Sequence, residues 1–152
     1  MARKRDPFTV DLFSELKPAP VVDRFADAEV KAWSLAGRLA KAVALTMEAS
    51  GKSREEIASE MTEVTKTNVS KAMLDAYASQ AREQHSISAL RLAALAIVTG
   101  DARAFNTLLE EAGLIVVPRK YEALLRRERA RELLEKLERE EKAADAEWRA
   151  NR

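Results

Sequence analysis

The chain has 152 residues, enough for one domain with a hydrophobic core or for a small domain with extensions. Its 26 basic and 25 acidic residues give a formal net charge of +1, so charge alone does not indicate a nucleic-acid partner. The lack of cysteine excludes disulfide scaffolds, zinc knuckles and thiol catalysis. No apolar run approaches the roughly 20 residues of a membrane helix, and we expect a cytoplasmic protein. Four glycines and 5% aromatic residues, with abundant Ala, Leu, Glu and Arg, predict an all-α fold.

Residues 1–26 are expected to form a flexible N-terminal arm, because Pro7, Pro18 and Pro20 interrupt regular structure there. A small cationic cluster occupies positions 3–5. Such a cluster either touches phosphates, as the arms of other DNA-binding proteins do, or belongs to a solvated chain terminus.

A first helix is predicted from about Asp27 to about Ser50, ended by Gly51. Apolar residues recur along one face of this helix at positions Trp33, Ala36, Ala40, Val43 and Met47. A tryptophan at this spacing is predicted to be a core residue rather than a platform for a ligand.

The sequence of residues 52–79 predicts two helices separated by a short polar turn. Ser53 and Glu56 have the spacing of a capping box, and helical apolar spacing follows it. The polar stretch 65–68 breaks this pattern, and a second helical run follows with Val69 early in it. Two short helices joined by a tight polar turn are typical of a helix-turn-helix.

From Gly51 to Gly113 the chain resembles the lambda-repressor-like helix-turn-helix fold, and most of all small phage regulators of the CII type and similar proteins of Mu-like transposable phages. The segments MLDAYASQAREQH and SISALRLAALAIVTGD carry much of this resemblance. Ala58 and Val69 match a small and a buried aliphatic position of the motif. Thr62 replaces the usual turn glycine, and the Ala58-to-Val69 spacing is one residue longer than usual. The resemblance implies the DNA-binding domain of a phage-encoded transcription regulator. The helices predicted from the sequence extend this domain to five helices over residues 27–117.

Two further helices are predicted after a polar bridge at residues 80–86. The bridge holds His85, the single histidine, which either caps a helix, contacts a phosphate or lies on the surface. A fourth helix, SALRLAALAIVTG, is apolar almost all round and is expected at the centre of the core. A fifth helix follows, with its inner face predicted at Phe105, Leu108, Leu109 and Ala112. The β-prone run 115–117 predicts either an edge strand or an extended linker.

Residues 118–152 predict an extended charged helix, because Arg, Glu, Leu and Ala dominate and neither glycine nor proline follows Pro118. Pairs of an acid followed four residues later by a base each stabilise such a helix by about 0.2–0.5 kcal/mol. A heptad-like seam is interrupted by Arg127 and Glu141. The helix is therefore either a weak coiled coil that joins copies through Leu134, Leu137 and Trp148, or mainly solvated.

No catalytic constellation is recognisable, since the glycines are scattered and the single histidine has no catalytic partner nearby. We expect no enzyme activity, no cofactor, no metal site and no small-molecule substrate. The candidate DNA-binding residues lie in the turn, the second motif helix and the bridge that follows: Lys66, Thr67, Asn68, Ser70, Lys71, Gln80 and Arg82. Their side chains are of the types that contact phosphates and base edges.

The expected function is sequence-specific binding of double-stranded DNA by a transcription regulator that forms a homo-oligomer. Five basic and six acidic residues between Lys52 and His85 predict weak binding by a monomer, so dimerisation or a helper protein is expected. The alternative function is that of a protein-interaction module, which has kept the fold and docks through its charged helix.

Overall fold

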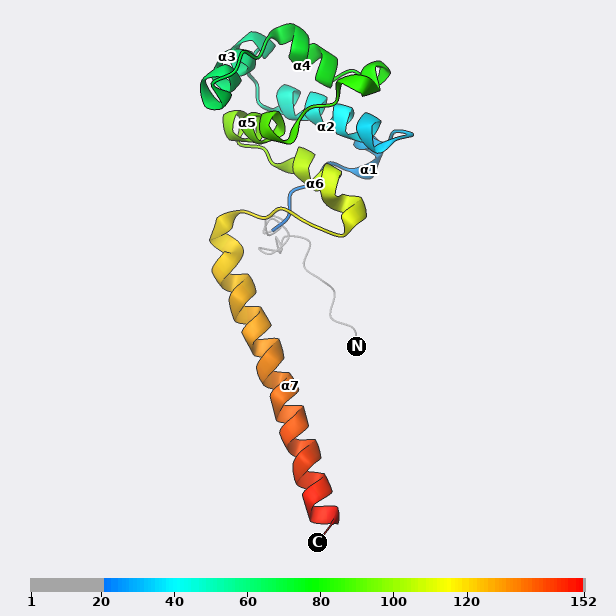
Figure 1. Cartoon of the computed structure of the whole chain (residues 1–152), viewed down its shortest axis with the longest axis vertical. Helices are drawn as coiled ribbons and strands as arrows, with labels where there is room; N and C mark the ends of the chain where they lie inside the picture. The colour runs from blue at the N-terminus through cyan, green and yellow to red at the C-terminus, as the bar shows by residue number, and fades with distance from the viewer. Residues whose placement is uncertain (1–20, 152) are drawn as a thin grey trace, which may run out of the picture. The chain divides into compact units, whose positions relative to one another are not determined.

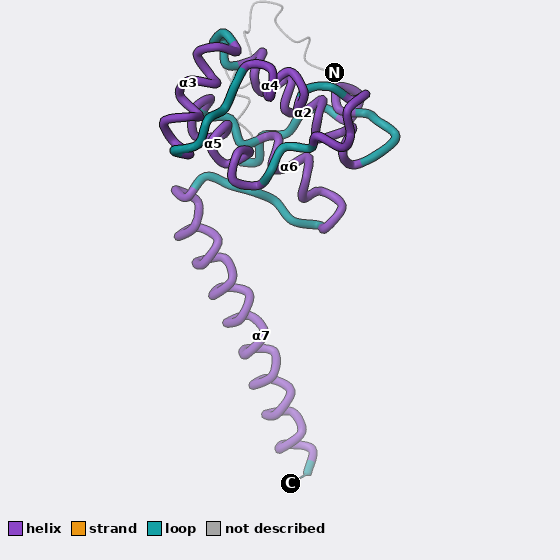
Figure 2. The backbone as a smooth tube through the Cα atoms, turned by 45° about the horizontal axis from the view of Figure 1, so that its top comes forward, coloured by secondary structure: helices purple, strands orange, loops and turns teal. Residues whose placement is uncertain are grey.

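The computed structural model describes residues 21–151, and only the backbone of residues 82–84. All regular structure in this range is helical, which confirms the all-α class and the long C-terminal helix (Figures 1 and 2). The chain divides between Val116 and Val117 into a globular unit and a second unit built on that helix. Residues 1–20 of the expected N-terminal arm lie outside the described part. No described helix combines the length and the apolarity needed to cross a bilayer.

The globular unit has a core to which four of its helices contribute fully buried side chains. Helix α2 packs against α6, and α3 packs against both α5 and α4. The elements in chain order are α1 (Asp27–Val30), α2 (Leu35–Ala49), α3 (Arg54–Thr65), α4 (Lys71–Tyr77), the 3-10 helix η1 (Gln80–His85), α5 (Ala89–Thr99), α6 (Arg103–Leu109) and the 3-10 helix η2 (Glu110–Ala112). The largest of the fully buried side chains are Val43 and Thr46 of α2, Ile57 and Met61 of α3, Leu74 of α4, and Leu92 and Leu95 of α5.

The segment predicted as one helix from Asp27 to Ser50 is interrupted between α1 and α2. Ser34 starts α2 as its N-cap, because its hydroxyl accepts a hydrogen bond from the backbone N–H of Gly37 at 3.0 Å. Trp33 lies in the connection and is 105% exposed, so its prediction as a core residue was wrong. The cap breaks the helical periodicity on which that prediction depended.

Helix α3 begins with the capping box that the sequence predicts. The Ser53 backbone N–H donates to the Glu56 carboxylate at 2.7 Å, and the Ser53 hydroxyl accepts from the Glu56 N–H at 3.2 Å. Hydrogen bonds from the Ser53 hydroxyl and backbone lower the pKa of Glu56. The carboxylate of Glu56 therefore stays ionised at neutral pH and satisfies a free donor at the start of α3.

Helix α5 is less buried than its apolar sequence predicts. Leu92 and Leu95 are buried in the core, whereas Leu90 and Ile97 are 64% and 67% exposed. The prediction of a centrally buried helix was therefore wrong for the outer face of α5. Within the described part of the globular unit, α3 and α6 pack against α5, and both residues of its outer face stay exposed.

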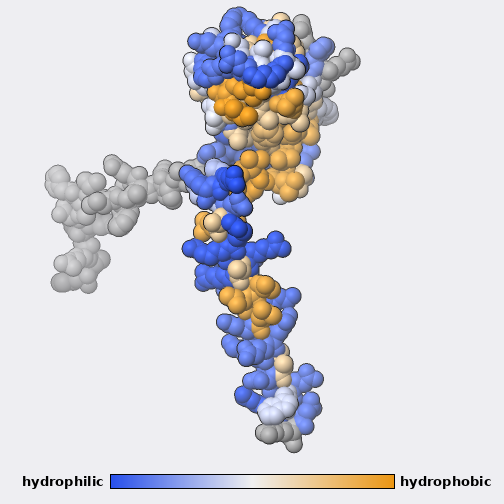
Figure 3. All heavy atoms as spheres, turned by 60° about the vertical axis from the view of Figure 1, so that its left-hand side comes forward, coloured by the Kyte–Doolittle hydropathy of each residue, from blue (hydrophilic) through white to orange (hydrophobic). Residues whose placement is uncertain are grey.

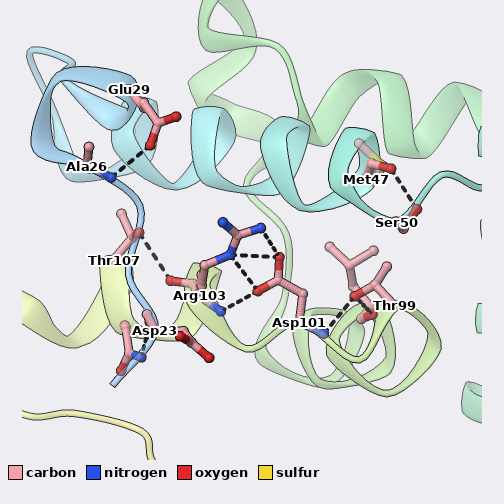
Figure 4. Close-up of polar contacts among 11 residues, drawn as sticks. Asp23, Ala26, Glu29, Met47, Ser50, Thr99, Asp101, Arg103 and Thr107 are labelled. Atoms are coloured by element: carbon pink, nitrogen blue, oxygen red, sulfur yellow. Dashed lines mark hydrogen bonds and ion pairs between the residues drawn. The ribbon is translucent and has the colours of Figure 1, made fainter. Parts of the chain in front are cut away.

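The start of α6 is fixed by Asp101, whose carboxylate accepts from the Arg103 backbone N–H at 2.9 Å and from the guanidinium of the same residue at 2.8–3.1 Å (Figure 4). The hydrogen bond to Asp101 raises the pKa of Arg103. The guanidinium also lies 4.2 Å from the centre of the Phe25 ring, a cation–π contact that joins α6 to the chain before α1.

The inner face of α6 differs from the predicted one. Ala104, Asn106 and Thr107 are buried, whereas Phe105 and Leu108 are only partly buried against the core. Residues 115–117 form no strand, so the second of the two sequence alternatives, an extended linker, describes this part of the chain.

The second unit consists of the 3-10 helix η3 (Arg119–Tyr121) and α7 (Glu122–Ala150), a helix of 29 residues without a buried side chain. Two of the predicted acid-first pairs are present, Glu135–Arg139 at 3.6 Å and Asp145–Arg149 at 3.4 Å. Such exposed pairs stabilise a helix only slightly. Figure 3 shows apolar side chains gathered at intervals along α7 among charged ones.

Candidate nucleic-acid interface

Helices α3 and α4 are joined by residues 66–70, here termed the α3–α4 turn. Lys66 ends α3 in the left-handed backbone conformation, with φ 54°. Ser70 is the N-cap of α4, since its hydroxyl accepts from the Met73 N–H at 3.3 Å. The second helix therefore begins after the predicted Val69, because the Ser70 hydroxyl accepts from the N–H of the third helical residue only when Ser70 itself is non-helical.

Side-chain hydroxyl groups of α3 form hydrogen bonds with residues of the α3–α4 turn. The Thr62 hydroxyl accepts from the Val69 N–H at 2.9 Å and lies 2.9 Å from the Ala58 carbonyl oxygen, to which it donates. The Thr65 hydroxyl oxygen accepts from the Thr67 N–H at 3.3 Å and from the Thr67 hydroxyl at 2.9 Å. Thr62 thus uses its side chain to order the turn at the position where the resembled family has glycine.

The turn displays three consecutive exposed side chains, Lys66, Thr67 and Asn68. Val69 points the other way and is only 4% exposed in the core, as predicted. Ser70 is half-buried, and its hydroxyl is already engaged as the cap of α4. The structure therefore brings Lys66, Thr67 and Asn68 together on the surface and gives Ser70 a role in the stability of α4.

Lys71, the first residue of α4, is exposed but paired. Its ammonium lies 2.6 Å from a carboxylate oxygen of Glu55 in the first turn of α3. This hydrogen bond is the main cause that lowers the pKa of Glu55 and raises the pKa of Lys71. A DNA phosphate that approaches Lys71 has to compete with the Glu55 carboxylate.

A second ion pair, between Arg54 and Asp75, also joins the start of α3 to α4, and sequence reasoning missed it. The two partners lie on different helices, so only the packing of α3 against α4 brings them together. No local pattern in the sequence could have predicted the pair. Together with the pair of Lys71 and Glu55, it joins α4 to the first turn of α3.

Gln80 lies beyond the C-terminal end of α4, whereas the α3–α4 turn precedes its N-terminal end. The whole of α4, seven residues or about 10 Å of helix, lies between the two positions. The exposed Gln80 is therefore not part of the cluster formed by Lys66, Thr67 and Asn68. The side chain of Arg82 lies outside the described residues, and its role in DNA binding stays a prediction.

The predicted oligomerisation residues lie on α7, where Leu134, Leu137 and Trp148 are 61%, 51% and 59% exposed. Within the described chain, His, Asp and Glu side chains form no group of three that could hold a metal ion. None of the protein-family profiles, curated proteins or solved structures compared with this chain matches it. The resemblance to lambda-repressor-like regulators thus stays a prediction from the sequence.

Proposed function

We propose that the globular unit is a lambda-repressor-like helix-turn-helix domain that binds double-stranded DNA sequence-specifically and regulates transcription in a phage. The observation that supports this proposal best is the α3–α4 turn. It is anchored in the core by Val69 and ordered by Thr62, and it displays Lys66, Thr67 and Asn68 at the entry to α4. Residues at the start of the second helix of such a motif are the ones that reach base edges in the major groove.

We also propose that the protein acts as a homo-oligomer. Lys71 and Arg54 are each paired with a carboxylate, so a single globular unit gains little from contacts with phosphates. A second unit linked to the first raises the overall affinity without any new contact within either unit.

Asn68→Ala tests the proposed base contact. We expect this variant to lose about 1–3 kcal/mol of discrimination at one base pair of the preferred sequence, because an asparagine amide can pair with an adenine edge. The measurement is selection from a random duplex pool, followed by fluorescence anisotropy on the selected sequence and on its single-base variants.

Asn151→Ala is the matched control, since it makes the same substitution just after the end of α7. It should leave the preferred sequence unchanged. If Asn68→Ala selects the same sequences with the same affinities as the control, Asn68 does not contact a base.

Lys66→Gly and Lys66→Ala separate the charge of Lys66 from its backbone conformation. Each variant should lower the affinity for every duplex sequence by the same factor. The dependence of that affinity on salt concentration should also become weaker, as expected after loss of one phosphate contact. Only Lys66→Gly removes the Cβ atom from a left-handed position, so it should be about 1 kcal/mol more stable than Lys66→Ala.

Thermal unfolding followed by circular dichroism measures the difference in stability between the two Lys66 variants. Equal stabilities would show that position 66 is not left-handed in solution. Equal binding by both variants and the unchanged protein would remove Lys66 from the interface.

The alternative function, a protein-interaction module, is favoured by one observation in the globular unit. Leu90 and Ile97 lie seven residues apart on one face of α5 and are both more than half exposed. Exposed apolar side chains on one face are typical of a contact site for another protein. If the unchanged protein retains no duplex from a random pool at low salt, the DNA-binding proposal fails and this alternative is the better one.

A further inference from the structure

Helix α7 carries an exposed apolar seam. The seam starts at Ala123 and continues in alternating steps of four and three residues to Trp148, which is the spacing of the contact face of a coiled coil. Leu134 and Leu137 lie at its centre and are both more than half exposed. No side chain of α7 is buried, so a second helix packed along the seam would remove apolar surface from water.

Two charged residues of the seam, Arg127 and Glu141, decide the direction of a second α7. In a parallel pair in register each seam residue meets its own copy, so Arg127 would face Arg127 and Glu141 would face Glu141. Like charges brought together in a partly dry seam repel each other. The flanking residues add to this conflict, since Arg126 would lie beside Arg131 of the second copy.

An antiparallel pair can instead place Leu134 opposite Leu137 of the second copy, and Leu137 opposite Leu134. The registers shifted by one heptad in either direction do not give the same leucine contacts. A shift by one heptad in one direction places Leu137 opposite Glu141, and a shift in the other direction places Leu137 opposite Arg127. Only the central register buries leucine against leucine.

In this register each charged seam residue lies opposite a small one. Arg127 faces Ala144 of the second copy, and Glu141 faces Ala130. The layers that hold Arg127 and Glu141 of the second copy are adjacent, about 4.5 Å apart along the axis. The two long side chains can therefore pair across the space left by the alanines, and the residues that conflict in a parallel pair become partners.

The flanking charges favour the same direction. Arg126 lies beside Glu147 of the second copy, and Arg131 beside Glu138. Residues 126–131 hold four arginines and one glutamate, whereas residues 138–147 hold five acidic and two basic residues. An antiparallel pair brings the basic block of each copy to the acidic block of the other.

We propose that α7 binds α7 of a second copy of this chain in an antiparallel coiled coil with Leu134 opposite Leu137. The inference deepens the proposed homo-oligomer and rests on it, but it does not depend on DNA binding. Because the two ends of the pair are equivalent, the first residues of the two α7 helices lie at its opposite ends.

Charge reversal in the full-length chain tests the pairing of Arg127 with Glu141. We expect Arg127→Glu and Glu141→Arg each to raise the dissociation constant of the dimer about tenfold or more in sedimentation equilibrium. The double variant should return to within about threefold of the unchanged protein, because the pair re-forms with its charges exchanged. Lys136→Glu, which makes the same charge change away from the seam and outside both charged blocks, is the control and should have little effect.

The direction of the pair can be measured separately, because the chain has no cysteine and accepts a single spin label. Ala146→Cys lies outside the seam near the end of α7. An antiparallel pair separates the two labels by about 30 Å along the helix axis, whereas a parallel pair keeps them side by side. Double electron–electron resonance measures the distance between the two spin labels and so distinguishes these two arrangements.

Three results would overturn the proposal: a monomer at every concentration, two labels side by side, or a double variant as weakly associated as the single ones. A monomer would leave α7 to a different protein partner. Duplex anisotropy on the unchanged protein tests DNA binding separately, because a protein that forms the α7 pair and binds no duplex would overturn the DNA-binding proposal alone.

Discussion

Replacing Val69 with aspartate is expected to lower the free energy of unfolding of the globular unit by about 4 kcal/mol or more. Val69 is 4% exposed and belongs to the hydrophobic core, and its backbone N–H is held by the Thr62 hydroxyl. A carboxylate at this position is either buried without a partner or forces the α3–α4 turn out of the core. Since a domain is stable by only about 5–15 kcal/mol, duplex binding should be lost together with the fold.

Asn68→Asp is the matched control for Val69→Asp, because it introduces the same charge at the exposed neighbouring residue. We expect it to weaken duplex binding while its thermal unfolding curve stays close to that of the unchanged protein. Circular dichroism melts of the two variants measure the difference. Equal melting temperatures would mean that the side chain at position 69 does not lie in the core.

The start of α3 and the two ends of α5 are set by local signals in the sequence, whereas the starts of α2 and α4 were not predicted. Ser53 and Glu56 form the capping box expected from their spacing, and Ser88 caps α5. Gly100 ends α5 in the left-handed conformation that glycine adopts without strain. Each of these interactions joins residues within one turn of the chain, so the sequence alone contains the necessary information.

Burial was predicted less well, because it depends on partners far away in the sequence. Trp33 has the spacing of a core residue, but Ser34 starts a new helix and leaves the indole in solvent. Leu90 and Ile97 are apolar and nevertheless exposed, since the helices around α5 cover only its other face. Hydropathy predicts that such residues favour burial but cannot tell whether a neighbour is present.

For the candidate DNA-binding residues, the sequence indicated which side chains of the turn are exposed, but not the contacts that they make. Lys66, Thr67 and Asn68 lie together on the surface as the sequence indicates. The pair of Lys71 with Glu55 depends on how α3 crosses α4, and a propensity argument says nothing about it. The left-handed conformation of Lys66 likewise could not be predicted from residue type, because it is unusual for a residue other than glycine.

Asn106 shows a contact of the same long-range kind in α6. Its side chain is 5% exposed and joins three segments of the globular unit. The amide nitrogen donates to the carbonyl oxygen of Asp23 at 2.9 Å and to that of Val116 at 3.2 Å, while the amide oxygen accepts from the Val116 N–H at 2.6 Å. A single side chain thus satisfies backbone groups both before α1 and after α6.

Replacing Asn106 with leucine is therefore expected to lower the free energy of unfolding by about 3 kcal/mol or more, because the bound backbone groups lose their partner.

Thr107→Val is the matched control. Thr107 is an equally buried neighbour, but its hydroxyl donates only to the carbonyl oxygen of Arg103 within the same helix, at 3.2 Å, so its loss should cost less than about 1 kcal/mol. Urea unfolding of the two variants measures both costs. If Asn106→Leu is as stable as Thr107→Val, the amide does not hold the two ends of the globular unit to α6. If the prediction is right, the ends should also exchange their amide hydrogens faster in Asn106→Leu, with Val116 among the first to lose protection.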